Sequence, residues 1–318
     1  RQIIMSKLQL EDMKVALIQG GVSAERDVSL STGKAFDEAL KELGVAVTVF
    51  DAREDLPKVL SELRPKVNVA LLALHGKLAE DGVVQGICEY LKFPYTGTGV
   101  LGACVAFDKF FSKKVFRSLG IPTADSLEVN AKLEDLKAIE LPFGLPCVVK
   151  PSREGSSVGV TIVQQETDFL PALQEAAKYD HFVLVEKYLD GKEITIPILE
   201  GRALTPIEIR PKVDFYNYEN KYTAGKTEYI LPPEVSEELV KEMKELALKA
   251  HNALRARVYS RVDFRLHEER PYVIEVNTLP GCTPTSLVPK SAAHEGVSFS
   301  EFIKILLLNA GLDYEDLR

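Results

Sequence analysis

The chain has 318 residues, 46% of them hydrophobic, with a formal net charge of −8, and this length predicts two or three packed units rather than one core. The acidic balance and the lack of a Lys/Arg block argue against a nucleic-acid partner. Its apolar runs fall short of the roughly 18 residues that span a membrane, and its first residues lack a signal-peptide core, so we expect no membrane association and a cytoplasmic location.

The first third of the chain alternates apolar runs with helical patterns. MKVALIQGG (13–21) is a strand-like run that stops at paired glycines, and residues 22–44 then place apolar side chains at helical spacing. VAVTVF (45–50), a helical stretch over 56–63 and the fully apolar VNVALLAL (67–74) continue the alternation. This order predicts a parallel sheet covered by helices.

The rest of the chain changes style. Residues 102–120 predict one long amphipathic helix, which ends before the Ile-Pro pair that follows. Short strands then surround a helix over 165–178, and further strands precede a helix over 234–256. We therefore expect two α+β units after an α/β unit. The predicted domains are 1–107, 108–189 and 190–318.

The loop KPSREGSSVGV (150–160) lies between two strand-like runs. It lacks the GxxxxGK[ST] spacing, and a strand rather than a helix follows it, so a helix N-terminus does not hold phosphate here. Its backbone N–H groups and the hydroxyls of Ser156 and Ser157 can instead fold over phosphates. A surface hairpin without ligand is the alternative.

Three charged residues near this loop suit a nucleotide. Lys150 precedes the loop on a strand, where its ammonium group can reach a phosphate. Glu186 and Glu193 flank a short hinge, where their carboxylates can bind ribose hydroxyls and an adenine edge. Each of the three also fits an ordinary charge at the end of a strand.

Residues 260–277, SRVDFRLHEERPYVIEVN, predict two strands joined by a polar turn. Their alternating apolar side chains are Val262, Phe264 and Leu266, and Tyr272, Ile274 and Val276. Burying both sets requires Asp263 opposite Glu275 and Arg261 opposite Asn277. Opposed carboxylates, with Cβ atoms about 5 Å apart, repel unless a cation separates them. Oxygen ligands with an amide favour Mg²⁺, and an Arg261–Asp263–Glu275 ion-pair network is the alternative.

Eight segments occur in the order of a known family. They are GGVSAERDVSL (20–30), ALHGKLAEDGVVQG (73–86), PYTGTGVLGACVAFDK (94–109), VVKPSREGSSVGV (148–160), VEKYL (185–189), YENKY (218–222), RVDF (261–264) and EVNTLPGCTPTSLVPK (275–290). Over about residues 14–308 the chain thus resembles the D-alanine–D-alanine ligases of the ATP-grasp family. The resemblance implies an ATP-grasp fold, α/β and α+β, in which an N-terminal parallel-sheet domain precedes two α+β subdomains that hold the nucleotide between them.

The resemblance also implies the reaction and its cofactors. The family joins two D-alanines for peptidoglycan precursor synthesis, using ATP and a D-alanyl phosphate intermediate. The residues that match the ATP contacts are Lys109, Lys150, Ser157, Glu186, Lys187, Tyr188, Leu189, Glu193 and Lys221. Asp263, Glu275 and Asn277 match the ligands of two Mg²⁺ ions, for which Mn²⁺ can substitute, and a K⁺ requirement is left open.

Further matches concern the two D-alanines. Glu25 matches the carboxylate that receives the ammonium of the first D-alanine, and His75 lies near that substrate's carboxylate. Ser286 and Leu287 match the pocket for the second D-alanine. Ser156 and Tyr222 match the pair that ties down a lid, residues 212–232, which we expect to exclude water.

The oxyanion and the amine proton complete the implied chemistry. Arg261 and the Gly281 backbone N–H are candidates to stabilise the tetrahedral oxyanion. The Tyr222–Ser156 pair is a candidate base for the second amine, and Tyr222 with Leu287 favours D-alanine over D-lactate or D-serine as acceptor. The resemblance further implies a homodimer through the N-terminal domain.

Three other readings compete. One is an amino-acid ligase of the same fold with another acceptor. Cys282 and Pro284 depart from the family pattern beside the second subsite, but this departure does not change the expected substrate. Another is a dinucleotide-binding oxidoreductase, suggested by QGGVSAE (19–25) but opposed by its spacing. The last is a catalytically silent nucleotide-binding module, which the intact carboxylate pair and Lys150 argue against.

Overall fold

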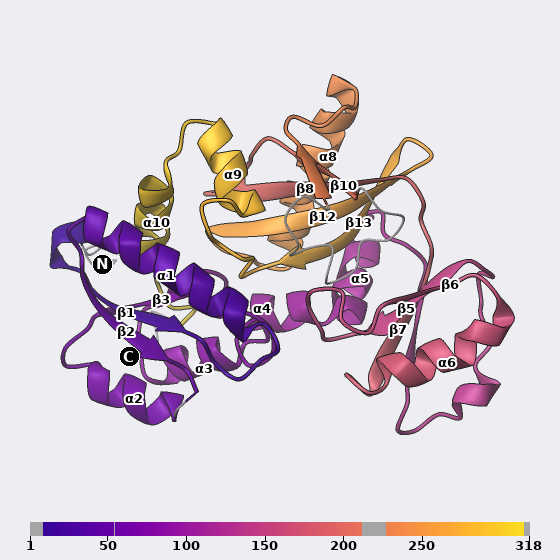
Figure 1. Ribbon diagram of the computed structural model, residues 1–318, viewed down its shortest axis with the longest axis horizontal. Helices are drawn as coiled ribbons and strands as arrows, with labels where there is room; N and C mark the ends of the chain where they lie inside the picture. Colours follow the sequence, from indigo (N-terminus) through magenta and orange to yellow (C-terminus); the bar gives the residue numbers. More distant parts are fainter. Residues whose placement is uncertain (1–8, 54, 212–226, 315–318) are drawn as a thin grey trace.

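The computed structural model describes residues 9–53, 55–211 and 227–314. Within these ranges the strands form three sheets, which we call the N-terminal, central and C-terminal sheets (Figure 1). A 3-10 turn (Leu10–Asp12) precedes the first strand. Each described helix is too short or too polar to cross a membrane.

The N-terminal sheet is parallel, with strand order β2-β1-β3. Its strands are β1 (Lys14–Gln19), β2 (Ala46–Asp51) and β3 (Val69–Leu72), and its helices are α1 (Arg26–Glu42), α2 (Leu56–Leu63) and α3 (Val83–Tyr90). Figure 1 shows α1 on one face of the sheet and α2 on the other. β3 is buried along its whole length. The predicted parallel sheet covered by helices is confirmed.

The predicted helix over 102–120 is wrong as a single element. The chain forms α4 (Val100–Phe107) and α5 (Lys109–Ser118), separated by Asp108 in an extended conformation. The Asp108 carboxylate accepts hydrogen bonds from the backbone N–H groups of Phe110 and Phe111, both at 3.1 Å, so it caps a new helix. The apolar pattern runs through this break, whereas the cap redirects the backbone.

The central sheet is antiparallel, with order β4-β7-β5-β6. Its strands are β4 (Ser126–Asn130), β5 (Cys147–Pro151), β6 (Thr161–Val163) and β7 (Phe182–Lys187). A 3-10 turn (Leu136–Ala138) and α6 (Glu166–Ala176) pack on it and close a separate apolar cluster. The expected strands around one helix are therefore present.

The C-terminal sheet has six strands, in the order β11-β10-β8-β12-β13 with β9 paired to β8. They are β8 (Lys192–Leu199), β9 (Arg202–Ala203), β10 (Ile207–Pro211), β11 (Thr227–Ile230), β12 (Tyr259–His267) and β13 (Arg270–Asn277), and α8 (Glu237–Ala253) packs on the sheet. β11 belongs to the predicted lid 212–232, so that part is a strand rather than a loop. Residues 212–226 lie outside the described ranges.

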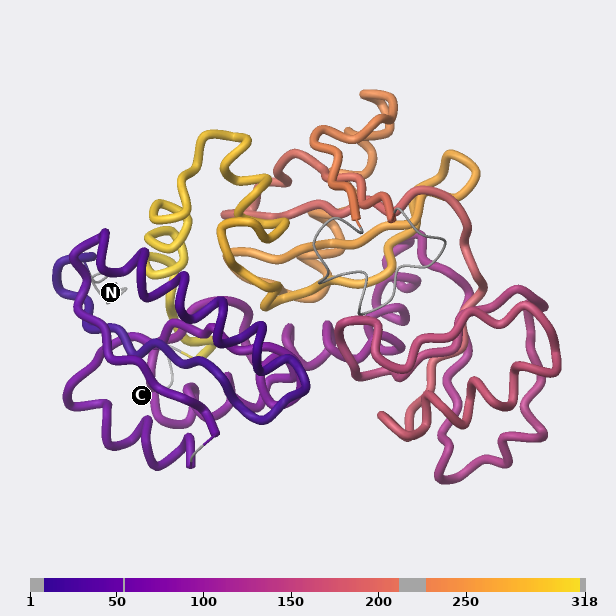
Figure 2. Tube along the Cα trace, in the orientation of Figure 1, coloured from indigo at the N-terminus to yellow at the C-terminus, as the bar shows by residue number. Residues whose placement is uncertain are grey.

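The last helices return to the N-terminal sheet. α9 (Leu287–His294) leads to α10 (Phe299–Leu308), and Figure 2 shows this segment beside the first helix. Phe299 packs against Phe36 of α1, with ring centroids 6.2 Å apart. Gly311 also pairs with Tyr95, so the N-terminal core contains both ends of the described chain.

The β12–β13 hairpin has the predicted register next to its carboxylates. Arg261 pairs with Asn277 and Asp263 pairs with Glu275. A β-bulge then shifts the ladder, so that Phe264 pairs with Val273. The expected burial of Tyr272 and Ile274 is therefore wrong: Pro271, Val273 and Val276 are buried, whereas Tyr272 and Ile274 are only partly covered.

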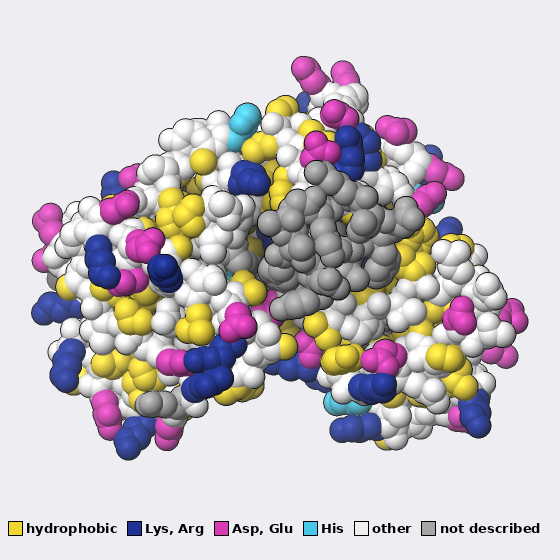
Figure 3. All heavy atoms as spheres, viewed as in Figure 1, with side chains coloured by type: hydrophobic (Ala, Val, Ile, Leu, Met, Phe, Trp, Pro, Cys, Tyr) yellow, Lys and Arg dark blue, Asp and Glu magenta, His cyan; other side chains and the backbone are white. Residues whose placement is uncertain are grey.

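The surface drawn in Figure 3 carries both signs of charge. Its Lys and Arg side chains are interspersed with Asp and Glu over the regions of all three sheets. On this face, neither sign of charge is gathered in a single patch.

Candidate functional site

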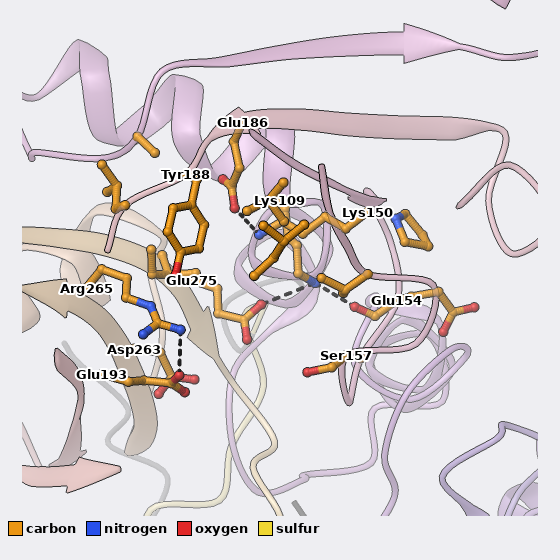
Figure 4. Close-up of a pocket in the computed structure, with 18 of the residues that line it drawn as sticks. Lys109, Lys150, Glu154, Ser157, Glu186, Tyr188, Glu193, Asp263, Arg265 and Glu275 are labelled. Carbon is orange, nitrogen blue, oxygen red and sulfur yellow. Dashed lines mark hydrogen bonds and ion pairs between the residues drawn. The ribbon is translucent and has the colours of Figure 1, made fainter. Parts of the chain in front are cut away.

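A cavity lies between the central sheet and the β12–β13 hairpin of the C-terminal sheet. The ends of β5 and β7, the loop after β5 and the bulged hairpin line it. Eight of the nine residues that match ATP contacts lie on its wall: Lys109, Lys150, Ser157, Glu186, Lys187, Tyr188, Leu189 and Glu193. Figure 4 labels six of them, all but Lys187 and Leu189. The ninth, Lys221, lies outside the described residues.

The roof of this cavity is the loop over residues 152–159, which we call the flap. Ser156 and Ser157 both have left-handed backbones, with φ of 53° and 60°. Such a conformation costs a non-glycine residue of order 1 kcal/mol, so surrounding contacts must hold it. The Ser156 hydroxyl donates a hydrogen bond to the Glu25 carboxylate, which belongs to the turn before α1. The flap therefore touches the N-terminal unit directly.

The base of the flap is anchored where the predicted long helix breaks. The Lys109 backbone N–H donates to the Ser152 carbonyl at 3.1 Å, and the Ser152 hydroxyl donates to Asp108 at 3.2 Å. The Lys109 ammonium donates to the Glu154 carbonyl at 2.6 Å and lies 3.2 Å from Glu275. Burial alone would lower the pKa of Lys109, but the nearby carboxylates, Glu275 first and then Glu80 and Glu186, together outweigh it and raise that pKa. Lys109 thus joins the flap to the carboxylate pair.

A buried charge cluster forms the floor near the hinge. Glu186, 3% exposed, forms ion pairs with Lys150 and with Lys113, the latter at 2.9 Å. Burial alone would raise the pKa of Glu186, but the two lysines outweigh it and lower the pKa to about 2. The carboxylate is therefore ionised and can only accept hydrogen bonds.

The predicted metal ligands lie together at the start of the hairpin. Asp263 accepts two hydrogen bonds of 2.9 Å from Arg261, one of 2.6 Å from Thr195 and one of 3.0 Å from the Asn277 amide. Both Asp263 and Glu275 line the cavity. The ion-pair network weighed from the sequence is thus present for Arg261 and Asp263, and Lys109 is the cation beside Glu275.

This donor set fits a hard divalent cation. Opposed carboxylates with a neighbouring amide oxygen supply the oxygen ligands that Mg²⁺ prefers, and it completes its shell with phosphates and water. Among the described residues, no group of three or more His, Cys, Asp and Glu gathers in the manner of a closed metal cage. Two carboxylates and an amide leave coordination positions for phosphate oxygens, so the arrangement suits an ion that a nucleotide brings with it.

A second pocket lies between the flap and the N-terminal unit. Glu25, Gly76, Lys77 and Glu154 are among its lining residues. Arg26 bonds Asp51 at the end of β2, with an Nη1–Oδ1 distance of 2.8 Å, and this contact lowers the pKa of Asp51 and anchors the turn that carries Glu25. The pocket places a carboxylate where an ammonium group can bind.

His75 lies beside this pocket rather than on its lining. Its Nδ1 is 2.9 Å from the Leu279 carbonyl and its Nε2 is 3.0 Å from the Thr32 hydroxyl. The ring is 4% exposed. Both nitrogens therefore face protein atoms, and His75 links β3 to the segment after β13.

The residues that match the second-substrate pocket lie between β13 and α9. Ser286 precedes α9, and its hydroxyl accepts a 2.9 Å hydrogen bond from the Thr283 backbone. Leu287 begins the helix, and Gly281 lies near Val28 of α1. None of the three lines the nucleotide cavity. Tyr222, the predicted partner of Ser156, lies outside the described residues.

Some residues of the site were missed in the sequence. Lys113 repeats at helical spacing with Lys109 and Phe116, so it falls on the buried face of α5, which was a usable signal. Lys77, by contrast, pairs with Glu154 and donates to the Tyr179 carbonyl at 2.9 Å. Those partners are far away in the chain, and no local pattern predicts the contact.

Comparisons with known proteins agree with this geometry. The family described as D-ala D-ala ligase C-terminus matches residues 115–308. The D-alanine–D-alanine ligase of Geotalea uraniireducens (strain Rf4) is 43% identical over 305 residues, which cover 96% of this chain and 97% of the relative. That of Anaeromyxobacter dehalogenans (strain 2CP-C) is 46% identical over 302 residues, covering 94% and 97%.

A solved structure gives the same result. The D-alanine–D-alanine ligase of Bacillus anthracis, crystallised in complex with ATP, has a TM-score of 0.83 and 37% identity, and the match covers 93% of this chain and 97% of that one. The family and the fold class predicted from the sequence are therefore confirmed. With a family match over more than half of its length and relatives above 40% identity over nearly all of it, the chain belongs to the D-alanine–D-alanine ligase family.

Proposed function

We propose that the chain uses ATP to join two D-alanines into D-alanyl-D-alanine for peptidoglycan synthesis. The observation that carries this function is that a nucleotide cavity, a pair of opposed carboxylates and a substrate-sized pocket beside Glu25 lie next to one another. The nucleotide cavity, the opposed carboxylates and the Glu25–Ser156 contact come from three sheets that are separate in the chain. Full-length relatives carry the same reaction in their names.

The proposed nucleotide position follows from the cavity wall. Lys150 and the flap, including Ser157, face the phosphates, and the hinge over residues 187–189 faces the base. Glu193 faces the ribose hydroxyls, and Lys221 contributes from outside the described residues. We assign the domains 1–107, 108–189 and 190–318. The three apolar clusters that accompany the three sheets support three units. They do not follow these bounds, because α5 packs in the C-terminal cluster and α9 and α10 pack in the N-terminal one.

Asp263, Glu275 and Asn277 would hold two Mg²⁺ ions, or Mn²⁺ in their place, and a K⁺ requirement stays a separate question. When bound, such ions neutralise charge on phosphates during phosphoryl transfer. The chain's own cations act beside them: Lys109 stands at Glu275, and Arg261 holds Asp263 in place through two parallel hydrogen bonds. The arrangement keeps the carboxylates aimed at the cavity.

The first D-alanine is proposed to bind between Glu25 and the flap. Glu25 receives its ammonium group, and His75 holds the wall behind its carboxylate through contacts to Leu279 and Thr32. The substrate carboxylate takes the γ-phosphoryl group of ATP, which converts a poor electrophile into an acyl phosphate. The flap and the lid over 212–232 then exclude water, which would hydrolyse that intermediate.

The second D-alanine is proposed to bind at Ser286 and Leu287 and to attack through its neutral amine. Arg261 and the Gly281 backbone N–H stabilise the tetrahedral oxyanion, and Ser156 with Tyr222 is the candidate pair to accept the amine proton. Phosphate leaves when the peptide bond forms. A cytoplasmic homodimer through the N-terminal unit completes the proposal.

Phosphate release from ATP tests the function. Wild-type protein should release phosphate with D-alanine and form the dipeptide, whereas L-alanine should give no release. Release with another D-amino acid or a D-hydroxy acid as the better acceptor would favour a ligase of different specificity. Turnover of a nicotinamide cofactor, or nucleotide binding without any ligation, would overturn the assignment.

A further inference from the structure

Lys113 is a buried cation one layer behind the nucleotide cavity. Its side chain is fully buried on α5, and it does not belong to the cavity wall, whereas Glu186 and Lys150 do. Its ammonium group lies 2.9 Å from Glu186 Oε2 and donates a 2.7 Å hydrogen bond to the Thr123 hydroxyl. Burial lowers the pKa of Lys113. A buried ammonium group destabilises the fold unless its contacts compensate, so the contacts to Glu186 and Thr123 must offset the cost of burying Lys113.

The first contact divides Glu186 between two cations. Glu186 Oε1 pairs with Lys150, which lines the cavity, and Oε2 pairs with Lys113, which does not. If Lys113 were neutral, the whole charge of Glu186 would attract Lys150. The Lys150 ammonium would then be held back from a phosphate. By sharing the charge of Glu186, Lys113 therefore weakens the attraction between Glu186 and Lys150, whose ammonium group must also bind a phosphate.

The second contact reaches the opposite wall of the cavity. Thr123 donates a 2.7 Å hydrogen bond to the Val273 carbonyl, and the Val273 N–H donates to the Pro122 carbonyl at 2.8 Å. Val273 directly precedes Ile274 and Glu275, which line the cavity beyond the bulge. Through Thr123, Lys113 thus joins β7 of the central sheet to β13 of the C-terminal sheet.

We propose that Lys113 is a positioning residue for nucleotide binding: it holds the Glu186 carboxylate in place for the base edge, leaves Lys150 available to phosphate, and fixes the separation of the two cavity walls. This inference rests on the proposed function, because it assumes that the cavity binds ATP. A purely structural ion pair is the competing explanation. That alternative predicts lost stability without a selective effect on nucleotides.

The proposal has a chemical signature in base selectivity. An ionised carboxylate accepts a hydrogen bond from the 6-amino group of adenine, and it repels the 6-keto oxygen of guanine. Without Lys113, Glu186 loses one of the two cations that hold it in position and keep it ionised. The preference for ATP over GTP should therefore fall together with ATP affinity.

The first experiment compares wild-type protein with Lys113→Met, which keeps the length of the side chain and removes its charge. ADP affinity is measured by calorimetry, and KM and kcat are measured for ATP, GTP and D-alanine. We expect ADP affinity to fall about tenfold and KM for ATP to rise similarly. The kcat value and KM for D-alanine should change less than about twofold. Unchanged ADP affinity in a folded Lys113→Met protein would overturn the proposal.

Lys114→Met is the matched control. Lys114 is the neighbouring lysine of the same helix, but it is exposed, with its ammonium 4.3 Å from the centroid of the Phe110 ring. We expect its ADP affinity and ATP preference to equal those of wild-type protein. A loss equal to that of Lys113→Met would show that any lysine removed from α5 has the same effect, and it would overturn the assignment to Lys113.

A double-mutant cycle separates positioning from general stability. If Lys113 acts mainly through Glu186, adding Lys113→Met to Glu186→Gln should weaken ADP binding by no more than about threefold, the loss expected from the Thr123 link alone, rather than by about tenfold. Fully additive losses would contradict the proposal. If Lys113→Met does not fold, Thr123→Val tests the second contact by itself, because it keeps the charge of Lys113 and removes the link to Val273. It should weaken ADP binding about threefold, and an unchanged affinity would again contradict the proposal.

Failure of the proposed function is recognised separately. If wild-type protein neither binds ADP nor forms a dipeptide from D-alanine, the function itself is wrong. If wild-type protein does both and the Lys113 variants bind ADP normally, only this inference fails.

Discussion

The floor of the nucleotide cavity and the flap above it are held by different kinds of contact. On the floor, the side chains of Lys113, Lys150 and Glu186 are 0%, 8% and 5% exposed. At the flap, Glu154 pairs with Lys77 of the N-terminal unit, whose side chain is 42% exposed. Buried charge pairs are costly to break, whereas exposed ones contribute about 0–1 kcal/mol and are screened by salt. The floor is therefore preorganised by buried charge, whereas the Lys77 pair adds little to the contacts that hold the flap.

Breaking the carboxylate pair should have the largest effect on turnover. Asp263→Asn keeps the shape of the side chain but removes the charge that a divalent cation requires. We expect dipeptide formation to fall about 100- to 1,000-fold, because charge stabilisation at the phosphates is lost. The rate is measured with saturating ATP and Mg²⁺.

The control for this variant is the thermal unfolding midpoint, which should stay within a few degrees of the wild-type value. Glu275→Gln should behave in the same way. A variant of either residue with the full rate would remove these carboxylates from the proposed metal site.

Adding a methyl group to the flap at Gly155 should have the next largest effect on turnover. A Cβ at Gly155 would lie 2.7 Å from Glu25 Oε2, so Gly155→Ala must displace either the flap or the carboxylate. Displacing a substrate-positioning group by about 1 Å can reduce the rate up to a hundredfold, and we expect kcat/KM for D-alanine to fall at least about tenfold. ADP affinity should change much less.

Gly86→Ala is the matched control, because a Cβ at Gly86 in α3 has no neighbour within 4 Å among the described residues. Its kcat/KM should equal the wild-type value. Equal losses in both variants would mean that the contact between flap and Glu25 is not what matters.

Lowering the pH should weaken the contacts of Glu186 on the floor of the cavity and so reduce the stability of the protein. The pKa of Glu186 is lowered from 4.5 to about 2, so its stabilising contribution is complete above pH 4.5 and is lost as the pH falls through 4.5 toward 2. The shift corresponds to about 3 kcal/mol as an order of magnitude. The free energy of unfolding should decline less steeply over this range in Glu186→Gln than in wild-type protein, as urea titrations at several pH values measure. If the free energy of unfolding fell equally steeply with pH in both proteins, the assigned role of Glu186 would be contradicted.

Removing the exposed Lys77–Glu154 ion pair at the flap should give the smallest effect. Lys77→Met removes the ion pair with Glu154 and the hydrogen bond to Tyr179. We expect kcat/KM for D-alanine to fall about two- to fivefold at low salt, and less at about 0.5 M salt, where the wild-type pair is itself screened. A loss that does not depend on salt would mean that Lys77 acts by packing rather than by charge.

Much of the fold follows from local patterns, and the failures have identifiable causes. The helix over 56–63 has the expected bounds, because its apolar spacing and its Asp55 cap agree. The helix over 102–120 breaks at Asp108, because a cap that bonds Phe110 and Phe111 outweighs a continuous apolar pattern. Sequence patterns therefore predict elements better than they predict interruptions inside them.

The candidate site was likewise predicted in part: the pairing of its carboxylates followed from the sequence, and the bulge beside them did not. Period-two alternation was sufficient to pair Asp263 with Glu275, because a slip by one residue would turn every apolar side chain of the strand to the other face. The bulge beyond this pair was not predicted, because alternation assumes a regular ladder. It turns Ile274 toward the cavity and Val273 into the core.

By itself, the sequence determined most of the order of strands and helices, apart from the break at Asp108 and strand β11, together with the register of the carboxylate pair and the family to which the chain belongs. These follow from backbone periodicity and from the order of short segments, both of which are local properties of the chain. Only the tertiary structure decided that Lys113 lies behind Glu186 and that Lys77 reaches the flap. Such contacts join elements far apart in the chain, and they depend on how whole sheets pack rather than on any pattern within one of them.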